Sequence, residues 1–133
     1  MGFIVIEFSL DGRSGVSPYL QVVQQVRQAL RLGLLRTGDQ LPTVKDAVAR
    51  LAINPNTVLK AYRELERDGL VAARPGVGTF VIRTLTDGSL AAHEPLRKDL
   101  RRWLAKARLA GLDDESIEAL FASTFRAAQE GVA

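Results

Sequence analysis

Two amphipathic segments separated by an Asn-Pro break lie between residues 43 and 68, and they constrain the fold more than any other feature. Thr43 and Asp46 form a T-x-x-D pattern, which is close to a capping box and predicts a helix start. Asn54 and Pro55 end this helix and begin the next, because asparagine caps free amides and proline is tolerated at the first helical position. We therefore predict helices near 43–52 and 54–68, joined by a tight turn as in a helix-turn-helix.

The second of these helices has one polar, largely basic face and one apolar face. At 100° per residue, four polar side chains fall within about 60° of one another. They are Asn56, Lys60, Arg63 and Arg67. The apolar face comprises Val58, Ala61, Tyr62 and Leu65. A polar face on an isolated helix is usually only solvated, but a recognition helix presents such a face to the major groove. Asparagine suits adenine, whereas lysine and arginine suit phosphates or guanine.

Residues 70–83 predict a β-hairpin that follows the helix-turn-helix. Two apolar runs, 70–73 and 79–82, flank a turn at residues 74–78 that is rich in proline and glycine. Its Gly-x-Gly does not predict a dinucleotide site, because Val81 stands where a third glycine is needed and no helix follows. The hairpin is either a plain hairpin or a wing, in which Arg74 supplies charge and Gly76 lets the backbone approach DNA.

The charge of the chain is informative mainly through its distribution. The net charge is +3, which alone is weak evidence for a nucleic-acid partner. Acidic residues are absent from two windows, 47–63 and 69–86. The first window carries Arg50, Lys60 and Arg63, and the second carries Arg74 and Arg83. A protein that contacts DNA through two separate elements requires two separate basic windows of this kind.

The remaining segments complete a mostly α fold with a small β-hairpin, of the α+β class. Alternating apolar residues predict an N-terminal strand at 3–8, and a Ser-Pro start predicts a helix near 17–33, with Ser17 able to cap it. We expect a winged helix-turn-helix DNA-binding domain at 1–86, including a wing at 70–83. Residues 87–133 are expected to form a short two-helix C-terminal dimerisation tail. A linker near residues 85–92 spans the boundary and precedes the two helices.

The two tail helices are too short to be stable without burying their apolar faces. These faces either fold back on the same chain or pair with a second copy, and we favour a homodimer. A two-fold dimer would present two recognition helices about 34 Å apart and would bind a palindromic operator in double-stranded DNA. The residues expected at the dimer interface are Leu96, Leu100, Trp103, Leu104, Ile117, Leu120, Phe121 and Phe125.

The sequence offers little for catalysis or metal binding. There is no cysteine, and His93, which we expect in a solvated loop before Pro95, is the only histidine. Residues 113–115 are acidic, but they stand where a helix start favours negative charge. We expect no enzyme, no cofactor, no metal and no membrane span, and a cytoplasmic location.

Residues 18–81 resemble the winged helix-turn-helix of the GntR family of bacterial regulators. Five blocks in the family's order carry the resemblance: 41–45 (LPTVK), 54–58 (NPNTV), 61–66 (AYRELE), 69–71 (GLV) and 76–81 (GVGTFV). The second and third blocks are most similar to the YtrA-type branch, whose members carry a short two-helix tail. Only 47 residues follow Thr86, which is few for a ligand-binding domain with its own core.

The resemblance implies a transcriptional regulator, with repression expected, and DNA contacts at the starts of two helices and at the wing tip. Lys45 stands where many members have arginine, which favours a phosphate contact over base reading. Leu59 is either a contact to a thymine methyl or an exposed leucine, and we favour the latter. A winged-helix module that binds protein or RNA remains the alternative. The complete predicted DNA-binding set is Thr43, Lys45, Asn54, Asn56, Thr57, Lys60, Arg63, Arg74 and Gly76.

Overall fold

The computed structural model describes residues 6–86 and 90–131, with the side chains of residues 90 and 91 left out. It divides into two compact units, Met1–Ala92 and His93–Ala133. Five helices and one two-stranded antiparallel sheet make up the described chain, which confirms the mostly α fold with a small hairpin. The boundary between the units lies a few residues after the predicted boundary at residue 86.

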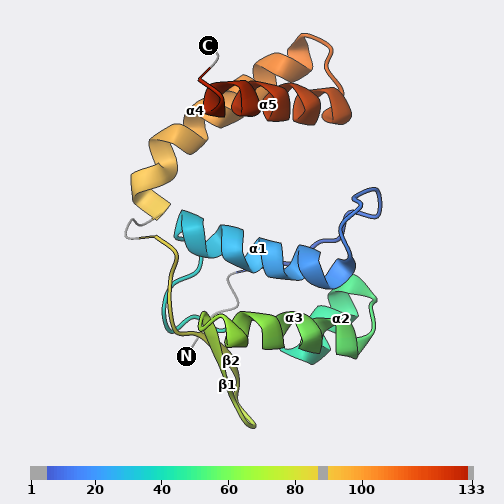
Figure 1. Ribbon diagram of the computed structural model, residues 1–133, viewed down its shortest axis with the longest axis vertical. Helices are drawn as coiled ribbons and strands as arrows, with labels where there is room; N and C mark the ends of the chain where they lie inside the picture. Colours follow the sequence, from blue (N-terminus) through green and yellow to red (C-terminus); the bar gives the residue numbers. More distant parts are fainter. Residues whose placement is uncertain (1–5, 87–89, 132–133) are drawn as a thin grey trace. The chain divides into compact units, whose positions relative to one another are not determined.

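The first unit is built on three helices: α1 (Pro18–Leu32), α2 (Val44–Leu51) and α3 (Pro55–Arg67). Helices α1 and α3 pack side by side, and α2 packs against α3 (Figure 1). The Thr43 hydroxyl accepts a hydrogen bond from the Asp46 amide at 3.1 Å and thereby caps α2, as predicted. Helix α1 begins after Ser17 with Pro18 at its first position, as predicted, but the Ser17 side chain makes no capping hydrogen bond.

The core of this unit comes from the apolar faces of the three helices and from the strands that follow them. Leu35 and Leu41 contribute from the loop between α1 and α2, and both are fully buried. Tyr62 lies in the core, and its hydroxyl donates to the carbonyl oxygen of Pro42 at 2.6 Å. Burial raises the pKa of Tyr62 well above its ordinary value, and the negative charge of Asp46 adds to this effect. The phenol is thus a buried donor with a partner, as a stable core requires.

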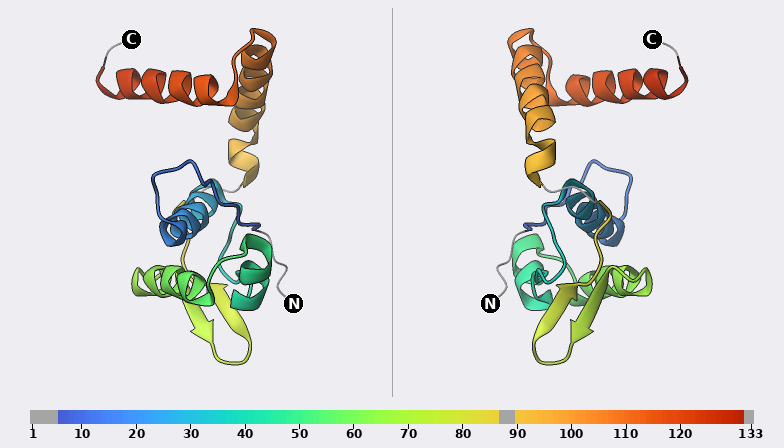
Figure 2. Two further views of the ribbon diagram at one scale, coloured as in Figure 1. Left: turned by 90° about the vertical axis from the view of Figure 1, so that its right-hand side faces the viewer. Right: turned by 90° about the vertical axis from the view of Figure 1, so that its left-hand side faces the viewer.

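Strands β1 (Val71–Arg74) and β2 (Gly78–Val81) form the predicted hairpin, which projects beyond α3 (Figures 1 and 2). The turn between them has proline and glycine at its two central positions, and the Val77 amide donates to the Arg74 carbonyl at 2.9 Å. Gly76 has a φ of 75°, the left-handed value that a type II turn needs there. Gln40 forms an isolated bridge with Phe80, so the preceding loop pairs with β2 on its other side.

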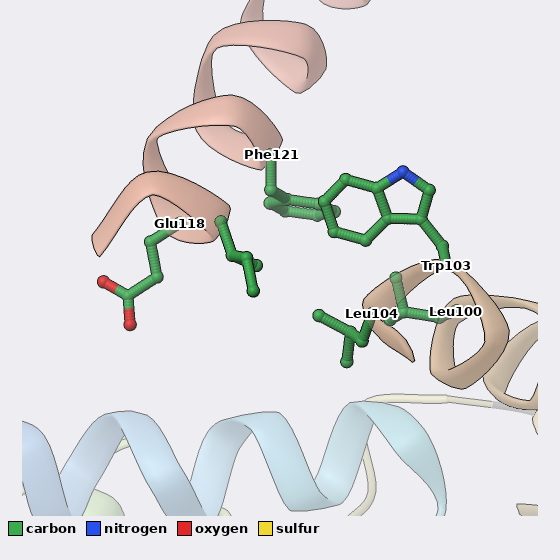
Figure 3. Close-up of a pocket in the computed structure, with 6 residues that line it drawn as sticks. Leu100, Trp103, Leu104, Glu118 and Phe121 are labelled. Carbon is green, nitrogen blue, oxygen red and sulfur yellow. The ribbon is translucent and has the colours of Figure 1, made fainter. Parts of the chain in front are cut away.

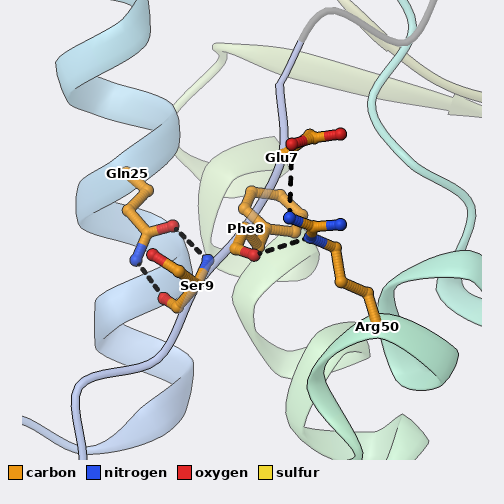
Figure 4. Close-up of polar contacts among 5 residues, drawn as sticks. All are labelled: Glu7, Phe8, Ser9, Gln25 and Arg50. Atoms are coloured by element: carbon orange, nitrogen blue, oxygen red, sulfur yellow. Dashed lines mark hydrogen bonds and ion pairs between the residues drawn. The ribbon is translucent and has the colours of Figure 1, made fainter.

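The N-terminal segment lies against the three-helix unit, held by side chains on both sides (Figure 4). Gln25 of α1 bonds both the amide and the carbonyl of Ser9, and Arg50 of α2 donates to the Phe8 carbonyl at 3.1 Å. The predicted strand at 3–8 is wrong for residues 6–8, which carry no strand assignment; residues 3–5 lie outside the described part. The apolar residues of the described part instead pack on the core: Phe8 is buried in it, and Ile6 packs against it.

The second unit contains most of α4 (Leu90–Leu109) and all of α5 (Asp114–Gln129). Helix α4 begins earlier than predicted and runs through Pro95, so His93 lies on a helix and is partly buried rather than in a solvated loop. The Asp113 carboxylate accepts from the Ser116 amide at 2.8 Å and caps α5. Hydrogen bonds from Ser116 lower the pKa of Asp113, which fits the predicted capping role.

Candidate nucleic-acid interface

Helix α3 presents the predicted polar face to solvent. Its four members (Asn56, Lys60, Arg63 and Arg67) are all exposed. The four apolar residues on the other side (Val58, Ala61, Tyr62 and Leu65) are all buried. The division of faces is therefore confirmed, because a helix that packs along one side must leave its opposite side outside the core. The polar face is available to a partner along the length of α3.

Lys60 lies on the side of this face nearest the start of α1. Its Nζ atom is 3.9 Å from the centroid of the Tyr19 ring, within the range of a cation–π contact. A cleft of about 350 Å³ opens beside this pair, lined by Pro18, Tyr19, Asn54, Asn56, Thr57 and Lys60. Four predicted DNA-binding residues therefore lie together with Tyr19, which was not predicted from the sequence. The sequence shows a Ser-Pro-Tyr helix start, but no local pattern in the sequence indicates that Tyr19 lies close to Lys60.

The other side of the polar face borders the hairpin, where Arg63 and Leu59 line a second cleft of about 170 Å³. We name it the wing-side cleft; it is also lined by Val44, Tyr62, Glu66, Ala73 and Thr79. Leu59 is partly buried here, so the expectation of an exposed leucine is wrong. The residue occupies the angle between α3 and the hairpin, which secondary structure alone does not reveal.

Two predicted contact residues also hold helix starts. The Asn54 side-chain oxygen accepts from the Asn56 amide at 2.8 Å, and the Thr43 hydroxyl serves α2 in the same way. Both oxygens therefore satisfy backbone donors that would otherwise have no partner. The amide nitrogen of Asn54 and the side chains of Asn56 and Lys45, all on exposed residues, are better placed to meet a ligand.

The tip of the hairpin carries the predicted cation. Arg74 is exposed, and its guanidinium carbon lies 4.8 Å from the centroid of the Phe80 ring. Gln40 supports the same tip, since its side-chain amide donates to the Val77 carbonyl at 3.3 Å. Gly78 has a φ of 147°, which residues with a side chain rarely adopt, and a Cβ atom there would also displace that amide. Arg74 is therefore exposed on a hairpin that the Gln40 side chain of the same unit supports.

The cations of the two basic windows divide into two groups. Arg50 bonds the Phe8 carbonyl and the Glu7 carboxylate, and Arg83 donates to the Asp68 carbonyl at 3.2 Å. Among residues 6–86 and 90–131, no carboxylate forms a salt bridge with Lys60, Arg63 or Arg74. Within these two windows, the cations without such a partner therefore lie on α3 and the hairpin. Sequence alone did not separate these groups, because the partners of Arg50 lie more than forty residues away.

The second unit has an apolar surface of a different kind. A cavity of about 310 Å³ is lined by Leu100, Trp103 and Leu104 of α4 and by Ile117, Glu118 and Phe121 of α5 (Figure 3). Phe121 stacks on Phe125 with ring centroids 5.9 Å apart, yet each is about half exposed. Leu96, Leu100 and Leu120 are also exposed, whereas Trp103 and Leu104 are partly buried. Ile117 is buried within the single chain, so it packs inside this unit and does not form part of its exposed surface.

The described segments lack two features that are typical of other protein classes. No group of three or more histidine, cysteine, aspartate or glutamate side chains there is arranged to hold a metal ion. Among the described helices, none combines the length and the apolar character that crossing a bilayer requires.

Comparison with known proteins gives consistent matches. Residues 18–81 match the sequence model of the bacterial regulatory proteins of the gntR family. The chain is 33% identical over 112 residues to the "HTH-type transcriptional repressor YtrA" of Bacillus subtilis (strain 168), covering 81% of this chain and 84% of that protein.

Two solved structures are similar over most of their length. A "Transcriptional Antiterminator" from Listeria monocytogenes EGD-e superposes with a TM-score of 0.57 and 28% identity, covering 90% of each chain. The GntR-family transcription factor YtrA from Sulfolobus acidocaldarius has a TM-score of 0.53 and 27% identity, covering 73% of this chain and 96% of its own. The similarity therefore extends beyond the three-helix unit and its hairpin.

Proposed function

Since this chain belongs to the GntR family of bacterial transcriptional regulators, we propose that it binds double-stranded operator DNA sequence-specifically, as a homodimer, through α3 and the β1–β2 hairpin. The observation that carries the proposal is the position of the uncompensated charge. Lys60, Arg63 and Arg74 are exposed and lack carboxylate partners among the described residues. The other cations of the basic windows, Arg50 and Arg83, bond groups of the protein itself.

In the proposed complex, α3 enters the major groove with its first turn toward the base edges. Asn56 is exposed in that turn, and its amide can donate and accept in the pattern that adenine presents. Lys60 is turned toward Tyr19 at the edge of the face, where a phosphate of the backbone would pass. Thr57, Asn54, Thr43 and Lys45 complete the contacts at the two helix starts.

The hairpin acts as a wing on the neighbouring minor groove or backbone. Pro75 and Gly76 at its tip have no bulky side chain, so the backbone can approach DNA closely. Arg74 supplies the charge, and its contact with the Phe80 ring limits the directions in which it can reach. We expect this contact to be with phosphate and to contribute equally to all sequences.

The second unit supplies the proposed dimer contacts. Two stacked phenylalanines and four leucines are exposed on the described parts of α4 and α5, which is unfavourable in water unless another surface covers them. A symmetric partner would cover the same residues on both chains and would place two recognition helices on one palindromic operator. Repression is the expected outcome, and the cytoplasm, where the chromosome lies, is the expected compartment.

Selection of bound duplexes from a random pool, with the mass of the protein measured in solution, tests the proposal. The expected result is an inverted repeat with half-sites about one helical turn apart, bound by a protein of twice the chain mass. Affinity should fall by orders of magnitude between about 50 and 200 mM salt. Enrichment of no duplex, together with salt-insensitive binding to RNA or protein, would contradict it.

A further inference from the structure

The wing-side cleft has a chemistry unlike that of the rest of the interface. Val44, Leu59 and Ala73 line it with apolar atoms from α2, α3 and β1 respectively. Its volume of about 170 Å³ suits a small group and not a whole ligand. It lies among predicted contacts, because Thr43 and Lys45 flank Val44 in the chain and Arg63 lines the cleft itself.

The charges around the cleft restrict what can enter it. The Glu66 carboxylate lines it and accepts a hydrogen bond from the Ala73 amide at 3.0 Å. A carboxylate in this position repels a phosphate, so the cleft does not suit the DNA backbone. Arg63 is exposed beside it and attracts a polyanion to the same place. The matching occupant is therefore a neutral, apolar group carried by an anionic polymer.

We propose that this cleft receives the 5-methyl group of a thymine in the operator and that Leu59 makes the contact that selects it. The inference rests on the proposed binding of α3 in the major groove. In that groove the 5-methyl is the one apolar group of the four bases, and cytosine lacks it. Leu59 lies on the same helix as Asn56, the predicted base-reading residue, and lines the cleft together with Arg63 of the exposed polar face. Val44 closes the cleft from the start of α2.

Replacing each thymine of a selected half-site in turn by deoxyuridine tests the proposal, because this change removes the methyl group and leaves base pairing intact. The wild-type protein is expected to bind about fourfold more weakly at one position, the effect of exposing one buried methyl group. The Leu59→Ala variant should bind thymine and uracil alike at that position. Leu59→Met should retain the preference. Leu32→Ala, which removes an exposed leucine at the end of α1, is the matched control.

Three results would overturn the inference. The first is a wild-type protein that binds its operator but responds to methyl removal at no position. The second is a thymine preference that survives unchanged in Leu59→Ala. The third is a preference for cytosine that Glu66→Gln abolishes, since the carboxylate would then read the base by accepting from its amino group. Failure to bind any duplex is a separate outcome, which would overturn the DNA-binding proposal as well.

Discussion

The ammonium group of Lys60 lies over the face of the Tyr19 ring, 3.9 Å from its centroid, and so links the start of α1 to the exposed face of α3. A lysine side chain has many rotamers and loses their entropy when a ligand immobilises it. A ring that already attracts the ammonium group lowers that cost, because the side chain is partly ordered before DNA arrives. Tyr19 is therefore a positioning residue for a cation of the proposed interface.

Replacement of Tyr19 by alanine should weaken binding to all duplexes alike, by about two- to fivefold, the strength of an exposed cation–π contact. Tyr19→Phe should bind nearly as well as wild type, because the ring face is retained. A double-mutant cycle with Lys60→Ala, measured by fluorescence anisotropy, checks the cause. Strictly additive losses would show that Tyr19 does not act through Lys60.

Replacement of Arg74 by alanine should lower affinity for specific and random duplexes equally and reduce the salt slope of log K by about one. The reason is that one phosphate contact at the wing tip is lost while base contacts remain. Titrations at several salt concentrations measure the slope. Arg31→Ala, at the last turn of α1, removes the same charge outside the proposed interface and should leave the slope unchanged.

Substitutions of Asn54 and of Asn56 should have different effects, although the two residues are close in the chain. Asn54→Ala removes the cap of α3 and should cost about 0.5–2 kcal/mol of stability, seen as a lower Tm, whereas Asn54→Asp should keep the cap. Asn56→Ala should leave Tm nearly unchanged but cost about 1–3 kcal/mol of discrimination at one base pair. Intact discrimination in Asn56→Ala would mean that this side chain does not read a base.

The buried phenol of Tyr62 predicts a loss of stability at alkaline pH. Its pKa is raised above the ordinary 10.0 in the folded state, so the folded protein holds this proton more tightly than the unfolded chain does. The free energy of unfolding should therefore fall as the pH rises above about 10. Tyr62→Phe should lose about 1–3 kcal/mol at neutral pH, because the Pro42 carbonyl is left without its donor. The same variant should show a shallower alkaline decline in denaturant titrations than wild type.

Phe121 provides the sharpest test of the proposed dimer. Its side chain is about half exposed and stacks on Phe125, so a glutamate there would place a charge in the proposed contact. Phe121→Glu should therefore halve the mass measured by sedimentation and weaken operator binding. Ser123→Glu introduces the same charge on an exposed residue of the same helix and should stay dimeric. If both variants have the mass of a dimer, the dimer contact lies elsewhere on the chain.

Much of the fold could be predicted from the amino-acid sequence because the signals are local. The two faces of α3 follow from helical periodicity, and the caps at Thr43, Asn54 and Asp113 follow from side chains that reach amides two or three residues away. The type II turn at Pro75 and Gly76 has the same origin. Each of these features depends on residues that are close together in the chain. The geometry of such a short stretch is the same in any helix or hairpin.

The tertiary structure decided which of the candidate residues face outward and which serve the protein itself. Arg50 and Arg83 looked equivalent to Lys60 and Arg74 until packing brought Phe8 and Asp68 within their reach. The same packing placed Tyr19 beside Lys60. The angle between α3 and the hairpin makes Leu59 line a cleft, although the sequence favoured an exposed leucine there. These relationships join segments far apart in the chain, whose approach depends on how the whole core packs and not on any local pattern.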